Sequence, residues 1–259
     1  MTELILLKIG GSVITEKDVA EPTINTKNLR RICKEIAEAY KNNSFKLVIV
    51  HGAGSFGHPI VKRTGIHEGI TRPDQVISFA RTQVLQNILN SEVCQTLQEF
   101  NLPAIPIQPS ASAIMDKKRL ISFNHELIKN LLELSLIPVL FGVPAFDKSQ
   151  KCSILSGDQI IVFLAKTLNP QKIIFASNVD GILGKDQNLI EEITEDNYDE
   201  IKNSLYDATY DDVTGSMAGK ISELKNIIGI KSYLINGNKP DLIKKILQGK
   251  EVRGTIIEF

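Results

Sequence analysis

Three lysines lie beside glycine-rich turns in this sequence, and together they have the chemistry to bind phosphate groups. Lys8 is near the end of an apolar run at residues 3–9 and precedes Gly10-Gly11-Ser12, and Lys17 follows at the far side of the same loop. Lys220 comes after a Thr-Gly-Ser-Met-Ala-Gly turn and falls in the first turns of a predicted helix. A cation is disfavoured there unless an anion lies in front of it. A solvated surface charge is the ordinary alternative for each lysine alone, but their place beside bare backbone favours an anionic ligand.

A second glycine-rich stretch, His51-Gly-Ala-Gly-Ser-Phe-Gly-His58, follows the apolar run at residues 45–50 without a spacer. That run predicts a buried strand, so the glycines would deliver backbone N–H groups to the edge of a sheet. The flanking histidines, His51 and His58, add titratable groups to this edge. A tight strand-to-helix turn is the alternative interpretation, since glycine-rich motifs have many false positives.

Acidic and amide side chains stand at two further predicted junctions. Ser156-Gly157-Asp158 precedes an apolar helical run at residues 160–168. The ordinary role of Asp158 at this position would be to cap the free N–H groups at the start of the helix. A carboxylate near several lysines would also hold their ammonium groups in place. Asn178-Val-Asp-Gly181 follows a predicted strand at residues 172–176, above the same sheet edge, where a nucleoside would lie.

Strands and helices alternate along the whole chain, which predicts one α/β domain with a mostly parallel sheet covered by helices on both faces. Residues 189–194 and 195–200 are interpreted as an excursion with a polar surface, and residues 108–122 carry no clear pattern beyond a polar turn near 116–119. Further strands are predicted at residues 103–107, 136–141, 230–236 and 254–257, and helices at 25–40, 72–100, 123–134 and 240–247.

The helix predicted at residues 72–100 is unusually long for a domain of this size. Its start, with Val76 and Phe79, lies close in sequence to the second glycine loop and is predicted to wall an apolar pocket. Its later turns are predicted to bury against another subunit. Ordinary core packing is the alternative for each of these apolar residues.

Composition restricts the class of protein. The 259 residues carry 30 Lys and Arg against 30 Asp and Glu, so no polyanion-binding surface is indicated and nucleic acid is not an expected partner. Three widely spaced cysteines without a CxxC pair are typical of reduced thiols in a cytosolic protein. The N-terminal apolar run is too short for a signal sequence or a membrane span. A cytoplasmic protein that does not enter membranes is therefore expected.

These motifs, in this order and over nearly the whole chain, resemble those of the amino acid kinase superfamily. The resemblance implies a three-layer sandwich with an acceptor-binding lobe at about residues 1–150 and a nucleotide-binding lobe at about 151–259. Within the superfamily, Phe56-Gly57-His58 is similar to the isopentenyl phosphate kinase family, which implies ATP, magnesium and transfer of a phosphoryl group to isopentenyl phosphate. It also implies a homodimer. One departure is visible, since Ser216 follows Gly215 where relatives often have a second glycine.

The resemblance also implies roles for individual residues. Lys8 and the Gly10-Gly11-Ser12 turn would hold the transferred phosphoryl group, Lys17 would stabilise the transition state, and Lys220 would bind ATP phosphates. His58 would bind the acceptor phosphate, and Asp158 would organise the lysines. The magnesium ion would be held mainly by ATP phosphates. The remaining implied contacts are Gly54, Asn178, Asp180, Gly181 and Gly215 for ATP, and Ala53, Gly54, Gly57, Val76, Phe79 and Gly157 for the acceptor.

The chemistry agrees with this interpretation. A phosphate monoester is largely dianionic at neutral pH, so the acceptor needs cations to offset repulsion and needs no general base. The sequence lacks a P-loop and the protein-kinase motifs. Three alternatives remain: a kinase for another small phosphate or phosphonate such as fosfomycin, a nucleotide-sensing module without turnover, and a dinucleotide-binding enzyme. The last is disfavoured because Asp74, the acidic residue that it would need, falls at a helix start.

Overall fold

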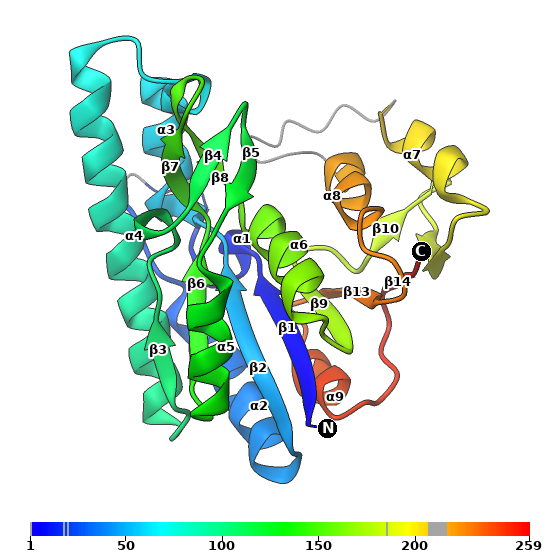
Figure 1. Cartoon of the computed structure of the whole chain (residues 1–259). Helices are drawn as coiled ribbons and strands as arrows, with labels where there is room; N and C mark the ends of the chain where they lie inside the picture. Colours follow the sequence, from blue (N-terminus) through cyan, green and yellow to red (C-terminus); the bar gives the residue numbers. More distant parts are fainter. Residues whose placement is uncertain (1, 18, 20, 185, 207–216) are drawn as a thin grey trace.

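The computed structural model describes residues 2–17, 19, 21–184, 186–206 and 217–259, and one large sheet forms its centre (Figure 1). The strands at the middle of the sheet are parallel, and β14 runs antiparallel to β13 at one side. In spatial order the eight strands are β12 (Glu192–Ile193), β14 (Thr255–Ile257), β13 (Lys231–Asn236), β9 (Lys172–Ser177), β1 (Glu3–Ile9), β2 (Phe45–His51), β6 (Ile137–Phe141) and β3 (Ala104–Pro106).

Helices cover both faces of this sheet, which confirms the predicted three-layer α/β fold. Successive residues of β1 point to opposite faces, so Leu7 packs in the core beneath one helical layer and Leu6 in the core beneath the other. One face is covered by α2 (Thr26–Asn42), α4 (Pro73–Glu99) and α9 (Leu242–Leu247). The other is covered by α5 (His125–Glu133), α6 (Gly157–Leu168), α7 (Tyr198–Tyr206) and α8 (Met217–Leu224).

A second, smaller sheet stands above the carboxyl ends of the central strands, beside the start of α4 (Figure 1). It consists of two hairpins: β4 (Ile114–Asp116) with β5 (Arg119–Ser122), and β7 (Val143–Asp147) with β8 (Lys151–Leu155). The buried carboxylate of Asp147 joins them, because it accepts hydrogen bonds from Lys118 N at 2.8 Å and from Ser153 Oγ at 2.9 Å. Periodicity did not predict this sheet, because its strands are short and β5 is mostly exposed.

The interpretation of residues 189–200 as an excursion with a polar surface was only partly right: its Glu and Asp side chains are exposed, but two short strands and two buried residues were missed. Residues 189–190 form β11 (Leu189–Ile190), which pairs with β10 (Ile182–Leu183), and β12 joins the edge of the main sheet. Ile193 and Tyr198 are buried in the core that α6, α7 and α8 share. Strands of two residues are too short to show an alternating pattern, so the charged neighbours dominated the sequence signal.

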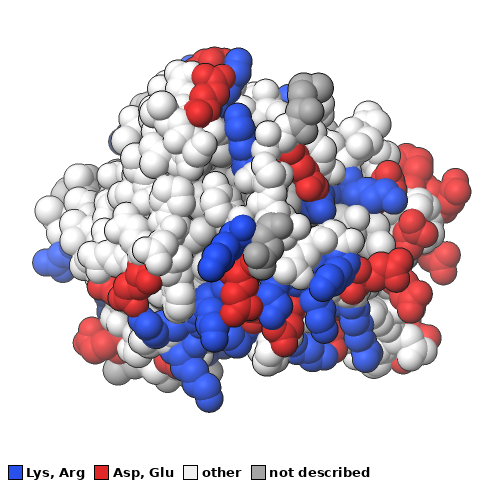
Figure 2. Space-filling model, turned by 90° about the horizontal axis from the view of Figure 1, so that it is seen from below, with Lys and Arg blue, Asp and Glu red and all other residues white. Residues whose placement is uncertain are grey.

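The surface at the amino-terminal edge of the main sheet carries charges of both signs. Figure 2 views the molecule from this side, and blue and red side chains are interspersed there. Lys172 at the start of β9 pairs with Glu3 at the start of β1, with 3.0 Å between Nζ and Oε1. In the described part of the chain, no helix is long and apolar enough to cross a membrane.

Candidate active site

The two glycine-rich turns lie against each other at the carboxyl ends of β1 and β2. The first leads into α1 (Gly11–Ile14), and the second contains the short helix η1 (Gly54–Phe56). A Cβ on Gly52 would lie 2.5 Å from Gly11 N, and a Cβ on Gly11 would overlap the backbone of Gly54. Gly54 also has φ of +51°, a left-handed conformation that favours glycine. The glycines are therefore required for the turns to approach, in addition to leaving backbone accessible.

Thr15, which follows α1, fastens the first turn to the second. Its hydroxyl donates a 2.8 Å hydrogen bond to Gly11 O and accepts a 3.1 Å bond from Ser55 N. Ser55 Oγ in turn accepts a hydrogen bond from Thr23 N at 3.2 Å. Side-chain hydrogen bonds thus join the two turns before any ligand arrives.

Lys8, Asp158 and Lys220 form one cluster beside these turns. Asp158 Oδ1 lies 3.2 Å from Lys8 Nζ, and Asp158 Oδ2 lies 2.9 Å from Lys220 Nζ. Alternate residues of β1 point to the same face of the sheet, so Lys8, like Leu6, points to the face covered by α6 and α8. Lys8 therefore reaches the carboxylate of Asp158 and lies near Lys220. Lys220 Nζ also lies 5.3 Å from the ring centroid of Phe175, the neighbour of Lys8 on β9. One carboxylate thus holds two ammonium groups at the carboxyl edge of the sheet.

Burial and charge act in opposite directions on this cluster. Burial lowers the pKa of Lys8 below its ordinary value, and the attraction of Asp158 offsets part of that effect. Burial by itself would raise the pKa of Asp158, but the two ammonium groups outweigh it and hold the pKa well below its usual range. Asp158 is therefore ionised at neutral pH and favours the charged form of Lys8. A phosphate dianion arriving beside Lys8 would favour that form further.

Ser156, and not Asp158, caps helix α6. Its hydroxyl accepts a 3.2 Å hydrogen bond from Gln159 N, which leaves the Asp158 carboxylate for the lysines. Gly157 allows the close packing of this helix start on the sheet. A Cβ there would lie 3.3 Å from Val50 Cγ1 and 3.4 Å from Lys8 Cε. The alternative reading of Asp158 as a simple cap was therefore wrong, and the ordering of lysines is the role that its contacts support.

The other end of the second turn carries His58, the half-buried first residue of α3 (His58–Thr64). The preceding Gly57 packs on Gln86 of α4, because a Cβ on Gly57 would overlap the Gln86 amide. Gln86 is fully buried, and its amide atoms have no hydrogen-bond partner among the residues that the structure describes. Gln86 thus shapes the loop in front of His58. No sequence signal indicated it, because it lies within a helix of mixed polarity.

His51 behaves differently from the titratable group expected at this edge. It is fully buried, stacks on Phe141, and its ring nitrogens are 3.1 Å from Asn90 Oδ1 and 3.0 Å from Gly52 O. Burial lowers its pKa to about 4, so the ring is neutral near pH 7. His51 is a structural link between β2 and α4.

Of the two residues predicted to wall the acceptor pocket, Phe79 lies in a small apolar cluster behind the second turn. Its neighbours there include Ile60 and Val61 of α3 and Cys152 of β8. The side chain of Val76, by contrast, is 51% exposed and is not part of this cluster. Of these two residues, only Phe79 is therefore in a position to contact an apolar acceptor.

A cavity of ≈ 420 Å³ lies at the carboxyl ends of β9 and β13. Asn178 and Asp180 line it, as do Leu189, Asn236 and Arg253 from segments that were not predicted to contribute. Asp180 accepts hydrogen bonds from Asn236 Nδ2 at 2.7 Å and from Lys239 Nζ at 2.6 Å. These bonds lower the pKa of Asp180, with the bond from Lys239 contributing most. Gly181 is needed behind the cavity, because a Cβ there would lie 2.6 Å from Thr255 Oγ1.

The structure thus brings most of the predicted residues to one edge of the sheet, with exceptions besides Val76. Lys17 is exposed on the loop after α1, and within the described ranges no ion pair joins it to the Lys8 cluster. Gly215 and Ser216 lie outside the described residues. In the part of the chain that the structure describes, no three His, Cys, Asp or Glu side chains gather as a metal site would require.

Comparison with known proteins agrees with this geometry. Residues 3–236 match the model of the amino acid kinase family, and the chain belongs to that family. Within it, the chain is similar over its whole length to isopentenyl phosphate kinases. That of Methanothermobacter thermautotrophicus is 38% identical and that of Methanocaldococcus jannaschii 36%, with 98% and 99% of each chain covered. A crystal structure of an isopentenyl phosphate kinase superimposes with a TM-score of 0.85 at 36% identity, covering 98% of this chain and 100% of the other.

Proposed function

We propose that this protein transfers the γ-phosphoryl group of ATP to isopentenyl phosphate, forming isopentenyl diphosphate and ADP. The Lys8–Asp158–Lys220 cluster carries the proposal, because it places two fixed ammonium groups beside the backbone turns at a single point of the sheet edge. Binding alone does not require so many cations around one position, whereas transfer between two anions does. Similarity to isopentenyl phosphate kinases and the presence of His58 support the choice of acceptor.

The proposed reaction is one in-line displacement. An oxygen of the acceptor phosphate forms a bond to the γ-phosphorus, the bond from that phosphorus to the β,γ-bridging oxygen breaks, and ADP leaves with the electron pair. Lys8 and the N–H groups of the first turn would hold the transferred group, and Lys220 would hold the ATP phosphates. His58 would donate a hydrogen bond to the acceptor phosphate. Lys17 would approach the transferred group from its exposed loop.

The residues present fit a magnesium ion carried by the nucleotide. Both oxygens of Asp158 face lysines, so this carboxylate is not available as a metal ligand. When bound to the ATP phosphates, magnesium would neutralise part of their charge. The nucleoside would occupy the cavity beside Asn178 and Asp180, so the C-terminal lobe would bind ATP and the N-terminal lobe the acceptor.

The substrate proposal is tested by ADP release with ATP and magnesium against a panel of acceptors. We expect activity with isopentenyl phosphate and dimethylallyl phosphate, because Phe79 and its cluster offer an apolar surface behind the phosphate-binding turn. Fosfomycin, UMP, carbamate and acetylglutamate serve as comparison acceptors. A clear preference for any of these four would refute the proposed acceptor. The absence of ATP turnover with every acceptor of the panel, isopentenyl phosphate and dimethylallyl phosphate included, would favour a sensing module.

We also propose that the protein is a homodimer joined through α4. The helix exposes Ile77, Val84 and Ile88, which are 7 and 4 residues apart and so lie on one side, and each side chain is about half exposed. An exposed apolar stripe of this kind is typical of an interface. Light scattering should give twice the chain mass, and Val84→Glu should give the mass of one chain. Ile228→Glu changes an exposed apolar residue elsewhere and should leave the dimer intact; dissociation by both variants, or by neither, would argue against α4.

A further inference from the structure

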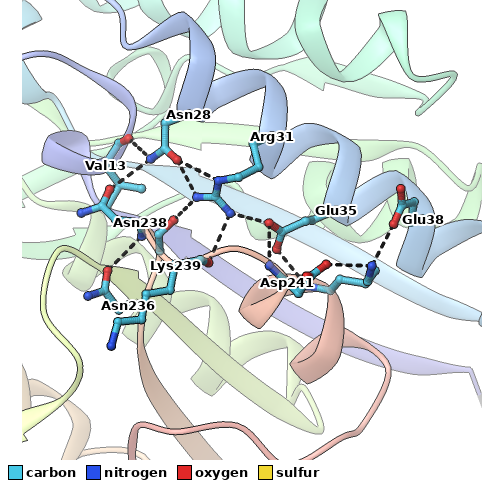
Figure 3. Close-up of polar contacts among 11 residues, drawn as sticks. Val13, Asn28, Arg31, Glu35, Glu38, Asn236, Asn238, Lys239 and Asp241 are labelled. Carbon is cyan, nitrogen blue, oxygen red and sulfur yellow. Dashed lines mark hydrogen bonds and ion pairs between the residues drawn. The ribbon is translucent and has the colours of Figure 1, made fainter.

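Arg31, on the first turns of α2, is the centre of a dense network of polar contacts away from the Lys8 cluster (Figure 3). Its guanidinium donates to Asn28 Oδ1 from Nε at 3.0 Å and from Nη2 at 2.5 Å. It also donates to Gly237 O and to the buried carboxylate of Glu35, and to Lys239 O at 3.3 Å. One planar group thus gathers acceptors from two segments of the chain, a task that suits the fork of donors in arginine.

One arm of this network reaches the phosphate-binding turn. Asn28 Nδ2 donates a 2.6 Å hydrogen bond to Val13 O, in the short helix α1, which begins at Gly11 of the first turn. Val13 N donates in turn to Gly10 O at 3.0 Å. Asn28 is itself held, because Arg31 donates to its side-chain oxygen. The position of the first turn is therefore fixed from behind by α2.

The other arm reaches the nucleoside cavity. Gly237 and Lys239, whose carbonyl groups accept from Arg31, belong to the loop between β13 and α9. The same loop holds Asp180 through the side chains of Asn236 and Lys239, and Gly237 N donates to Ser177 O at 2.7 Å. Asn28 Nδ2 also donates to Asn238 Oδ1 at 3.1 Å. The cavity wall and the phosphate turn are thus connected to the same two side chains of α2.

The far side of Arg31 is fixed as well. Glu35, one turn further along α2, accepts hydrogen bonds from Asp241 N at 3.0 Å and from Lys244 N at 3.3 Å, which are donors at the start of α9. The Glu35 side chain is only 6% exposed, and that of Arg31 is 23% exposed, so the acceptor is buried and the guanidinium is mostly covered. A hydrogen-bonded pair of this kind, with its carboxylate buried, is held in one arrangement. Arg31 cannot change its direction without breaking contacts both within α2 and with the loop between β13 and α9.

We propose that Arg31, acting with Asn28, is a positioning residue for the nucleotide: it sets the separation between the turn that binds the phosphates and the cavity that binds the nucleoside. Neither side chain lines the cavity or belongs to the Lys8 cluster, so both act through other residues. The inference rests on the proposed function, in that one ATP molecule spans the turn and the cavity. Because a preorganised site avoids the cost of ordering on binding, loosening this connection should weaken ATP and spare the acceptor.

The test compares Arg31→Lys, Arg31→Met and Asn28→Ala with the matched control Arg30→Met. Arg30 is the adjacent arginine of α2, is half exposed, and pairs with Glu99 of α4 at the surface. ATP binding is measured by calorimetry without acceptor, and KM for isopentenyl phosphate is measured at saturating ATP. We expect about a tenfold weaker ATP affinity in the Arg31 variants, from the loss of charge-assisted hydrogen bonds, and an unchanged KM for the acceptor. Arg30→Met should match the wild type in both measurements.

The double variant and the stability of the single variants test the positioning role of Arg31 further. If Asn28 and Arg31 act as one unit, the loss in Asn28→Ala/Arg31→Lys should be smaller than the product of the single losses. Wild-type ATP affinity in a folded Arg31→Lys protein would overturn the inference, as would a parallel weakening of ATP and acceptor that follows a drop in Tm. Failure of the proposed function itself would be seen separately, as a wild-type protein that does not bind ATP or does not phosphorylate the acceptor.

Discussion

Replacing Lys8 with methionine is expected to lower kcat by about 10²–10³-fold while leaving the Tm unchanged or raised. The loss of activity follows because a preorganised donor aimed at the charge that develops during transfer contributes on that scale. The stability follows because methionine keeps the volume and removes a buried ammonium group whose pKa burial already lowers. Asp158 would keep Lys220 as a partner at 2.9 Å, so no unpaired carboxylate remains. Steady-state kinetics and thermal unfolding measure the two effects.

The same protein contains a matched control for this variant. Lys172 lies on the adjacent strand β9, pairs with a carboxylate at 3.0 Å, and is 16% exposed, compared with 15% for Lys8. It lies at the opposite edge of the sheet, so Lys172→Met should retain wild-type kcat. If Lys8→Met kept most of its turnover in a folded protein, or if the Lys172 variant lost as much, the reaction would have to be placed elsewhere.

Replacing His58 with alanine is expected to lower kcat/KM for isopentenyl phosphate by about 10- to 100-fold, with ATP affinity unchanged. A hydrogen bond to a charged group contributes about 1.5–3 kcal/mol, which corresponds to that range. The effect should fall on the acceptor alone, because the nucleoside cavity and the Lys8 cluster are built from other segments. His58→Asn can still donate a hydrogen bond and should recover part of the activity. Separate titrations with ATP and with isopentenyl phosphate distinguish the two ligands.

His125→Ala is the corresponding control, because His125 is likewise the first residue of a helix, α5, on the opposite face of the sheet. It should leave both affinities unchanged. An alternative role for His58 is to order the glycine turn, and alanine would then weaken ATP and acceptor together. That parallel loss, without recovery in His58→Asn, would remove His58 from the acceptor site.

Much of the fold and part of the site could be predicted from the sequence, because the long central strands and amphipathic helices carry their own periodicity. The run before Lys8 became β1 with the predicted bounds, and the stretch predicted at residues 72–100 became α4. The lysine near the end of this run and the glycines beside it were also enough to propose a phosphate-binding edge. The short strands of the second sheet and the region around β12 were missed, because two to four residues cannot show a period and their burial depends on distant partners.

Contacts between distant segments were decided only by the tertiary structure. The sequence suggested two roles for Asp158, and its distances to Lys8 and Lys220 select the one that involves both lysines. His51 and His58 flank the same glycines, yet only burial against α4 shows that His51 is neutral. Arg31 and Gln86 gave no signal at all. Their roles depend on carbonyl groups and glycine backbone that are more than 25 residues away in the chain, and side-chain type and local spacing contain no information about such partners.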